Sequence, residues 1–199
     1  MAYDDPSPEI LERLERAEQL KIDGKHKEAL VILEELLLDD PENVSALEEV
    51  ADNYLSLEEY ERAETAAKQA VAVDAGSYTG YYILGFLHSR EDSWDDAVEH
   101  LRKANSLKSN NAEILRCLGW ALFHAGNRAQ GIVTLERALN LDQDSALTLC
   151  DLGVAYLEAR NFIKSRTLFE RALDLEPGNQ RAKECLRMAE QIEKAGVKK

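Results

Sequence analysis

The sequence predicts an all-α fold, a right-handed superhelical α-solenoid of five 34-residue helix-turn-helix repeats followed by a C-terminal capping helix, eleven helices in all. First, the chain aligns with itself without a gap at a shift of 34 residues. Second, small residues return at fixed repeat positions, where two helices must approach closely. Third, the strong helix formers Ala, Leu, Glu, Lys and Arg dominate a chain that holds only four prolines and ten glycines.

The self-alignment sets the register of the repeats. They occupy 10–43, 44–77, 78–111, 112–145 and 146–179. The eighth position of the successive repeats reads Ala17, Ala51, Gly85, Gly119 and Gly153. Larger apolar residues recur between the small ones. Because neither helix of a pair can bury its apolar face alone, we expect neighbouring repeats to stack around one continuous core.

Both ends of the repeat array depart from the repeat pattern. In the lead-in 1–9, Ser7-Pro8-Glu9 offers an N-cap, a proline at the first helical position and an acid in the first turn. Residues 180–193 carry an apolar stripe of Ala182, Cys185, Leu186, Ala189 and Ile192, which predicts a helix that covers the last repeat. Residues 194–199 are expected to form a frayed tail.

Composition and charge disfavour several classes of protein. The formal net charge is −14, and no basic patch runs along the expected helices, which argues against binding to nucleic acid or to anionic membranes. No apolar run reaches the roughly 20 residues of a membrane span. The acidic start of the chain is unlike a secretory signal. Three cysteines without a C-x-x-C pattern predict free thiols, so we expect a cytoplasmic protein.

Nothing in the sequence indicates catalysis. No phosphate-binding glycine motif occurs, and no His stands at metal-ligand spacing to a Cys or a second His. His88 is expected to be a core or half-buried residue, whereas His100 and His124 are expected to be isolated on helix surfaces. We therefore expect no enzyme activity, no metal and no cofactor.

Several repeats carry a common motif. The best copies are Leu149-x2-Leu152-Gly153-x2-Tyr156 and Leu115-x2-Leu118-Gly119-x2-Leu122, and a proline near the repeat end survives as Pro41 and Pro177. This pattern resembles that of the tetratricopeptide repeat family, W-x2-L-G-x2-Y followed by A-x3-F and P, over about residues 10–179. The resemblance implies a concave groove, lined by the first helix of each repeat, that binds a segment of another protein.

Repeat positions 2, 5, 9 and 12 share the groove face of the first helix. Position 9 reads Glu18, Asp52, Phe86, Trp120 and Val154, so the predicted groove begins acidic and becomes apolar. The residues predicted to bind a partner are Glu18, Glu48, Asp52, Tyr82, Phe86, Arg116, Trp120, Phe123, Val154 and Leu157. Some family members grip a terminal carboxylate with Lys, Asn and Arg on this face, but here the matching positions are acidic or aromatic, so we do not expect that role.

The charge is unevenly distributed along the chain. Residues 1–77 carry 21 acidic and 7 basic side chains, whereas residues 78–179 carry 14 and 11. The leading hypothesis is a non-catalytic adaptor or scaffold for a partner segment of apolar and basic character. The alternatives are a client chaperone similar to the tetratricopeptide chaperones of type III secretion, self-association into a homo-oligomer, and a regulatory subunit or domain of a larger complex or enzyme. Caps at both ends favour a whole solenoid over a piece of one.

Overall fold

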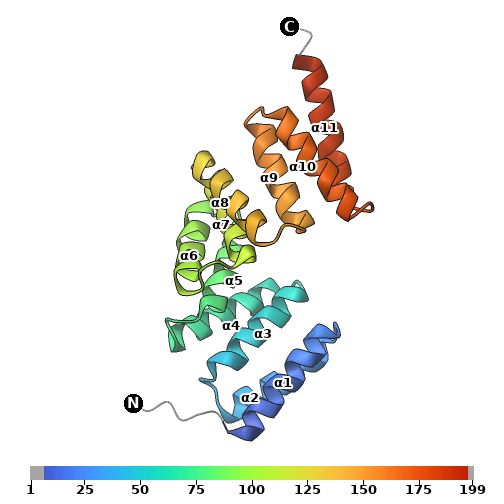
Figure 1. The fold of residues 1–199 in the computed structure, drawn as a ribbon. Coiled ribbons are helices and arrows are strands. Elements are labelled where there is room, and N and C mark those ends of the chain that lie inside the picture. The colour runs from blue at the N-terminus through green and yellow to red at the C-terminus, as the bar shows by residue number, and fades with distance from the viewer. Residues whose placement is uncertain (1–6, 197–199) are drawn as a thin grey trace. The chain divides into compact units, whose positions relative to one another are not determined.

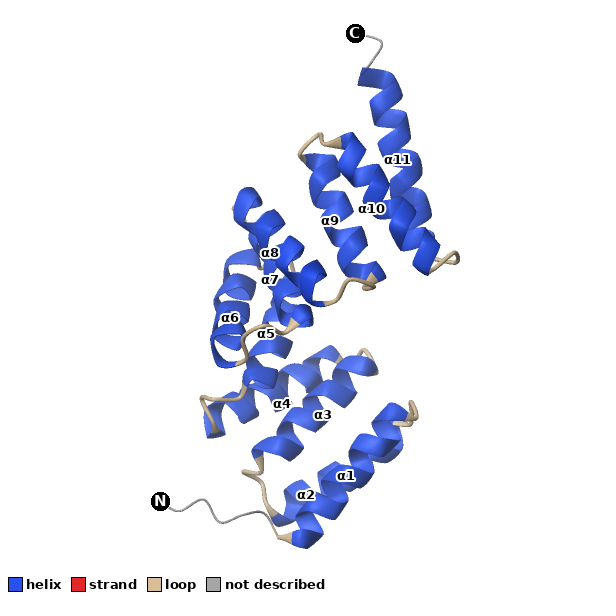
Figure 2. Ribbon diagram, viewed as in Figure 1, coloured by secondary structure: helices blue, strands red, loops and turns tan. Residues whose placement is uncertain are grey.

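The computed structural model describes the backbone of residues 7–196 and the side chains of residues 7–193, and this part of the chain forms eleven α-helices (Figure 1). The helices are α1 (Pro8–Ile22), α2 (His26–Asp39), α3 (Val44–Ser56), α4 (Tyr60–Val73), α5 (Tyr78–Arg90), α6 (Trp94–Leu107), α7 (Ala112–His124), α8 (Arg128–Leu141), α9 (Ala146–Glu158), α10 (Phe162–Leu175) and α11 (Gln180–Gly196). Figure 2 shows helices and loops and no strand in the described residues. The predicted all-α class and its eleven helices are confirmed.

The chain divides into two compact units. The N-terminal unit comprises residues 1–91 and contains α1–α5, and the C-terminal unit comprises residues 92–199 and contains α6–α11. Within each unit, every helix packs against the next helix in the sequence. First helices of successive pairs also touch: α1 contacts α3 and α3 contacts α5, while in the C-terminal unit α7 contacts α9 and α9 contacts α11. We call these aligned helix surfaces the first-helix face of each unit.

A repeated N-cap starts the first helix of each pair. The capping residues are Ser7, Asn43, Ser77, Asn111, Ser145 and, before α11, Asn179. In every case the side-chain oxygen accepts a hydrogen bond from the backbone N–H three residues later. This bond satisfies a backbone donor that the helix itself leaves unpaired, so the Ser/Asn alternation marks the helix starts.

The tight turn inside each pair contains one residue in the left-handed region. These residues are Gly24, Glu58, Asp92, Gly126 and Arg160, each 34 positions after the one before, with φ between 57° and 89°. A left-handed φ costs a non-glycine residue about 1–2 kcal/mol. Two of the five turns avoid this cost through glycine, and the other three bear it.

The small repeat positions allow helix backbones to touch. A Cβ atom built on Gly131 of α8 would lie 2.7 Å from the carbonyl oxygen of Gly119 and 2.7 Å from the backbone nitrogen of Phe123, both on α7. The two glycines therefore bring α7 and α8 into direct backbone contact, as the recurring small residues predicted.

Helix α11 covers the end of the C-terminal unit. It packs on α10 and α9, with Ala182 and Ala189 buried and Cys185 and Leu186 half-buried. The predicted stripe differs at Ile192, which is 43% exposed. The helix also runs to Gly196, three residues beyond its expected end. Residues 1–6 of the expected lead-in and residues 197–199 of the expected tail lie outside the described residues.

Candidate functional site

The first-helix face of the N-terminal unit holds a shallow cavity of about 250 Å³ between α1 and α3. It is lined by Leu11, Leu14, Glu15, Glu18, Ser45, Glu48 and Glu49. Glu18 is exposed, and so is Leu11 at 45%. Five of the lining residues occupy positions 2, 5 and 9 of the first two repeats, so the helical spacing placed them on one face. The lining therefore combines two leucines with four carboxylates, Glu15, Glu18, Glu48 and Glu49, which we call the acidic rim.

Two of the acids expected in the groove already have partners. Lys21 Nζ donates to Glu49 at 2.7 Å and to Asp52 at 3.1 Å. The Ser77 hydroxyl donates to Glu48 at 2.6 Å, and burial raises the pKa of Glu48. Glu48 and Asp52 therefore serve in part to hold α3 against its neighbours, whereas Glu15 and Glu18 are the exposed acids of this rim.

The aromatic residues of α5 lie in a different environment from the acidic rim. Tyr82 and Phe86 are half-buried and pack against the core of the N-terminal unit, which includes Ile83, Leu84 and Leu87. Each ring thus contributes to packing and leaves part of its surface accessible.

A chain of ion pairs crosses the first-helix face of the C-terminal unit. Asp151 of α9 is only 2% exposed, and each of its oxygens is bound by an arginine. Arg116 Nη1 of α7 donates to Oδ2 at 2.8 Å, and Arg181 Nη2 of α11 donates to Oδ1 at 2.8 Å. Arg116 also pairs with Glu113 at 2.5 Å. A buried carboxylate requires such compensation, so these contacts tie α7, α9 and α11 together.

The surroundings of Arg116 maintain its positive charge. Burial opposes that charge, but the hydrogen bond to Glu113 and the nearby charge of Asp151 raise the pKa of Arg116 above its ordinary value. The side chain is only 13% exposed. Arg116 therefore acts first as a bridge within the unit.

Trp120 belongs to an aromatic cluster that also contains His124. The His124 ring centroid lies 4.3 Å from Trp120, 4.6 Å from Trp94 and 5.5 Å from Phe123. The Arg181 guanidinium lies over the Trp120 ring at 5.5 Å from its centroid. The expectation that His124 is isolated on a helix surface is therefore wrong. Trp120 is half-buried, not fully exposed.

Phe123 does not lie on an accessible face. It is 2% exposed and packs with Leu135, Leu152, Ala155 and Tyr156 in the core of the C-terminal unit. Gly131 of α8 explains this, because its missing Cβ lets the Phe123 backbone approach α8 directly. We therefore exclude Phe123 from the proposed binding surface. Val154 and Leu157 of α9 are half-buried.

The three cysteines are free thiols. Burial raises the pKa of Cys117 to about 12 and that of Cys150 to about 11, and it also raises the pKa of half-buried Cys185. Only the thiolate is a nucleophile, so Cys117 and Cys150 are chemically quiet at neutral pH.

Two features of the faces were not recognised from the sequence. The first is the contact between Asp151 and Arg181. Asp151 is the only charged residue in α9 before Glu158, and a single acid in an otherwise apolar helix segment indicates a buried carboxylate with a partner. The exposed leucines at repeat position 2, Leu11 and Leu147, were placed on the groove face but not among the binding residues. They are 45% and 55% exposed, more than any aromatic residue predicted to bind.

Among the side chains that the structure describes, no three His, Cys, Asp or Glu residues gather as a metal-binding group. Within the same part of the chain, no helix combines the length and apolarity needed to cross a membrane.

The sequence pattern of the tetratricopeptide repeat matches residues 20–82 and 146–179. The chain is a tetratricopeptide-repeat protein. It is 24% identical over 119 residues to anaphase-promoting complex subunit 3 of Schizosaccharomyces pombe, a match that covers 60% of this chain and 18% of that protein. The chain thus spans less than a fifth of the length of this relative.

Solved structures share the fold. A tetratricopeptide-repeat protein of Thermus thermophilus superposes with a TM-score of 0.71 at 21% identity, over 90% of this chain and 97% of that one. YrrB, described as having an unusual peptide-binding site, gives 0.66 at 20% identity over 88% and 90% of the two chains. A chain of the Cut9–Hcn1 hetero-tetramer of the anaphase-promoting complex gives 0.81 at 20% identity, over 92% of this chain and 36% of that one.

Proposed function

We propose that the protein is a non-catalytic adaptor or scaffold that holds an extended or helical segment of a partner protein against its first-helix faces. Tetratricopeptide-repeat domains typically bind proteins or peptides, and the extended surfaces of repeat proteins suit such partners. The observation that supports this proposal most directly is the cavity between α1 and α3, which is lined by exposed Leu11, half-buried Leu14 and four carboxylates.

The chemistry of this cavity indicates the character of the partner. An apolar side chain would cover the leucines, and a Lys or Arg side chain nearby would meet the exposed Glu15 and Glu18. Burying apolar area is worth roughly 25 cal/mol per Å², and the charges mainly accelerate encounter and select the partner. In the C-terminal unit, the accessible parts of Trp120, Val154 and Leu157, together with Leu147, supply a further apolar surface.

Affinity purification with two matched double variants tests the proposal. The first, Leu11→Ser/Glu18→Gln, removes one exposed aliphatic group and one exposed acid from the first-helix face. The control, Val31→Ser/Glu35→Gln, removes the same groups from α2, where Val31 is 57% exposed. We expect the first variant to lose partners that the control and the wild type retain. Equal retention by both variants would contradict a first-helix binding surface.

A second candidate function is that of a subunit in a large assembly. The similarity to anaphase-promoting complex subunit 3, and the shared fold with a chain of the Cut9–Hcn1 hetero-tetramer, favour it. Sedimentation of the native protein from its source cell distinguishes the two roles. Quantitative migration with a complex of many subunits supports the subunit role, whereas migration at the size of the chain plus one partner supports the adaptor.

A further inference from the structure

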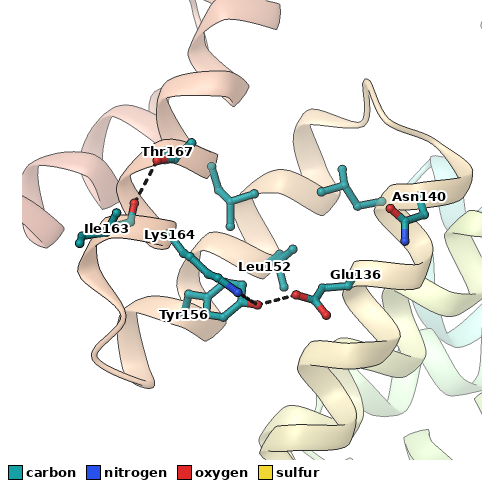
Figure 3. A pocket seen from close by; sticks show the side chains of 9 residues that line it. Glu136, Asn140, Leu152, Tyr156, Ile163, Lys164 and Thr167 are labelled. Carbon is teal, nitrogen blue, oxygen red and sulfur yellow. Dashed lines mark hydrogen bonds between the residues drawn. The ribbon is translucent and has the colours of Figure 1, made fainter.

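A cavity of about 480 Å³ lies in the C-terminal unit, away from the first-helix face, between α8 and α10 and above part of α9. Four aliphatic residues line it, Leu139, Leu152, Ile163 and Leu168, together with Asn140, Thr167 and a polar group at one end that consists of Glu136, Tyr156 and Lys164. Figure 3 shows Tyr156 at the polar end with Glu136 and Lys164 on either side. The volume falls within the roughly 300–1,000 Å³ of small-molecule sites.

The polar end of the cavity has a structural role. The Tyr156 hydroxyl donates to Glu136 Oε1 at 2.5 Å and accepts from Lys164 Nζ at 3.0 Å. The same arrangement occurs 102 residues earlier in the N-terminal unit, where the Tyr54 hydroxyl donates to Glu34 and the Arg62 guanidinium lies 4.4 Å from the Tyr54 ring centroid. Because it recurs, this group belongs to the repeat architecture and is not by itself evidence of a ligand.

Half of the aliphatic lining, in contrast, differs between the two units, because Leu139 and Leu152 correspond to Leu37 and Val50 whereas the other two residues have no large aliphatic equivalent. Ile163 and Leu168 stand where the N-terminal unit has Glu61 and Ala66. Ile163 lines the cavity and remains 68% exposed. Covering such a side chain removes apolar surface from water, which makes an apolar occupant favourable here.

The charges of the cavity select an uncharged occupant. Glu136 and Lys164 balance each other. Burial, followed by the hydrogen bond to Glu136, raises the pKa of Tyr156, and the hydrogen bond to Tyr156 raises the pKa of Lys164, so the phenol stays neutral and the amine stays charged. A charged ligand would contact the aliphatic side chains without a free counter-charge, because Glu136 and Lys164 are already joined through the Tyr156 hydroxyl. A carboxylate has about four lone-pair sites, and the Tyr156 hydroxyl uses one, so Glu136 retains acceptor capacity.

We propose that the cavity between α8 and α10 binds an uncharged, largely apolar small organic molecule that carries one hydroxyl or N–H donor. The aliphatic walls receive its apolar body, and the donor turns toward Glu136 at the polar end. This site is separate from the first-helix face, and its existence does not depend on the proposed adaptor function.

Fluorescence titration with N-phenylnaphthylamine, a neutral probe of two aromatic groups joined through an N–H, tests the proposal on the whole chain. We expect saturable binding of one probe per chain. The variant Thr167→Trp fills the cavity from its exposed rim and should weaken binding about tenfold or more. The matched control is Thr65→Trp, the same repeat position in the N-terminal unit, where the hydroxyl makes the same backbone bond; it should bind like the wild type.

Two further measurements keep the test decisive if Thr167→Trp folds poorly. Ile163→Glu introduces the residue type that the N-terminal unit has at the equivalent position, Glu61. Because Ile163 is 68% exposed, the chain should tolerate this change, and binding of the neutral probe should weaken about tenfold. The anionic probe anilinonaphthalene sulfonate should bind the wild type at least about tenfold more weakly than the neutral probe. Any one of four results would overturn the proposal. The first two are that the neutral probe shows no saturable binding, or that it binds Thr167→Trp as tightly as Thr65→Trp. The other two are that it binds Ile163→Glu as tightly as the wild type, or that the wild type prefers the anionic probe.

Discussion

Replacing Asp151 with alanine should destabilise the C-terminal unit severely. Asp151 is 2% exposed and is the common partner of Arg116 and Arg181. Its removal leaves Arg116, whose side chain is 13% exposed, with only Glu113 as a counter-charge. Breaking a buried pair by removing one partner costs about 3–5 kcal/mol, because the remaining charge stays buried.

That loss is large relative to the roughly 5–15 kcal/mol that stabilises a typical protein. For a chain of this length, 1 kcal/mol shifts the melting temperature by about 2–4 °C, so Asp151→Ala should lower it by about 6–20 °C. Thermal unfolding followed by circular dichroism measures the shift. The control is Asp144→Ala, which removes an 81% exposed carboxylate that lies 3.7 Å from Arg171 and should cost about 0–1 kcal/mol. If the two variants melt at similar temperatures, the buried network does not stabilise this unit.

Three other predictions concern the turns, the thiols and the terminal helix. In urea denaturation, Gly126→Ala should lower the free energy of unfolding by about 1 kcal/mol, and Arg160→Gly should raise it by up to about 1 kcal/mol, because both residues occupy the left-handed region. A Cβ at Gly126 meets no atom within 4 Å, so backbone conformation alone sets the cost there. A stabilised Gly126→Ala variant would contradict this. Cys117 and Cys150 should react with a disulfide reagent at neutral pH only on unfolding, and more slowly than Cys185. Because the folded-state pKa of Cys117 is raised, its contribution to stability should be present at neutral pH and be lost as the pH rises from about 8.5 toward about 12; an unchanged pH profile in Cys117→Ala would refute this. Deleting residues 180–199 should expose the apolar surface of α10 and remove the Arg181–Asp151 pair, so light scattering should detect aggregation. A truncated protein that stays monomeric with an unchanged melting temperature would show that α11 does not cap the unit.

The repeat period predicted most of the fold because it is local. Helices α3, α5, α7, α9 and α11 each follow a Ser or Asn at the same repeat position, and Gly24 and Gly126 mark two of the five tight turns. The equivalent left-handed residues Glu58, Asp92 and Arg160 are not glycines, although their φ values lie between 57° and 60°. Composition alone could not identify them.

The binding surface was less predictable because exposure depends on contacts between helices. Trp120 and Phe123 stand at neighbouring groove positions, yet only Phe123 is fully buried, because Gly131 admits its backbone to α8. Asp151 and Arg181 are 30 residues apart, and Arg181 belongs to a helix outside the five repeats, so no repeat position predicts their contact. The period gives the face on which a residue lies, and the neighbouring helices decide how much of the side chain is accessible.

Site-specific photocrosslinking tests the central claim most directly. A photoreactive phenylalanine analogue would replace Leu11 or Leu147 on first helices, or Val31 or Val133 on second helices, four aliphatic side chains that are between 45% and 57% exposed. In the source cell, positions 11 and 147 should crosslink to the same partner protein, and positions 31 and 133 should not. Crosslinks to that partner from the second-helix positions alone, or equally from all four, would contradict binding on the first-helix faces.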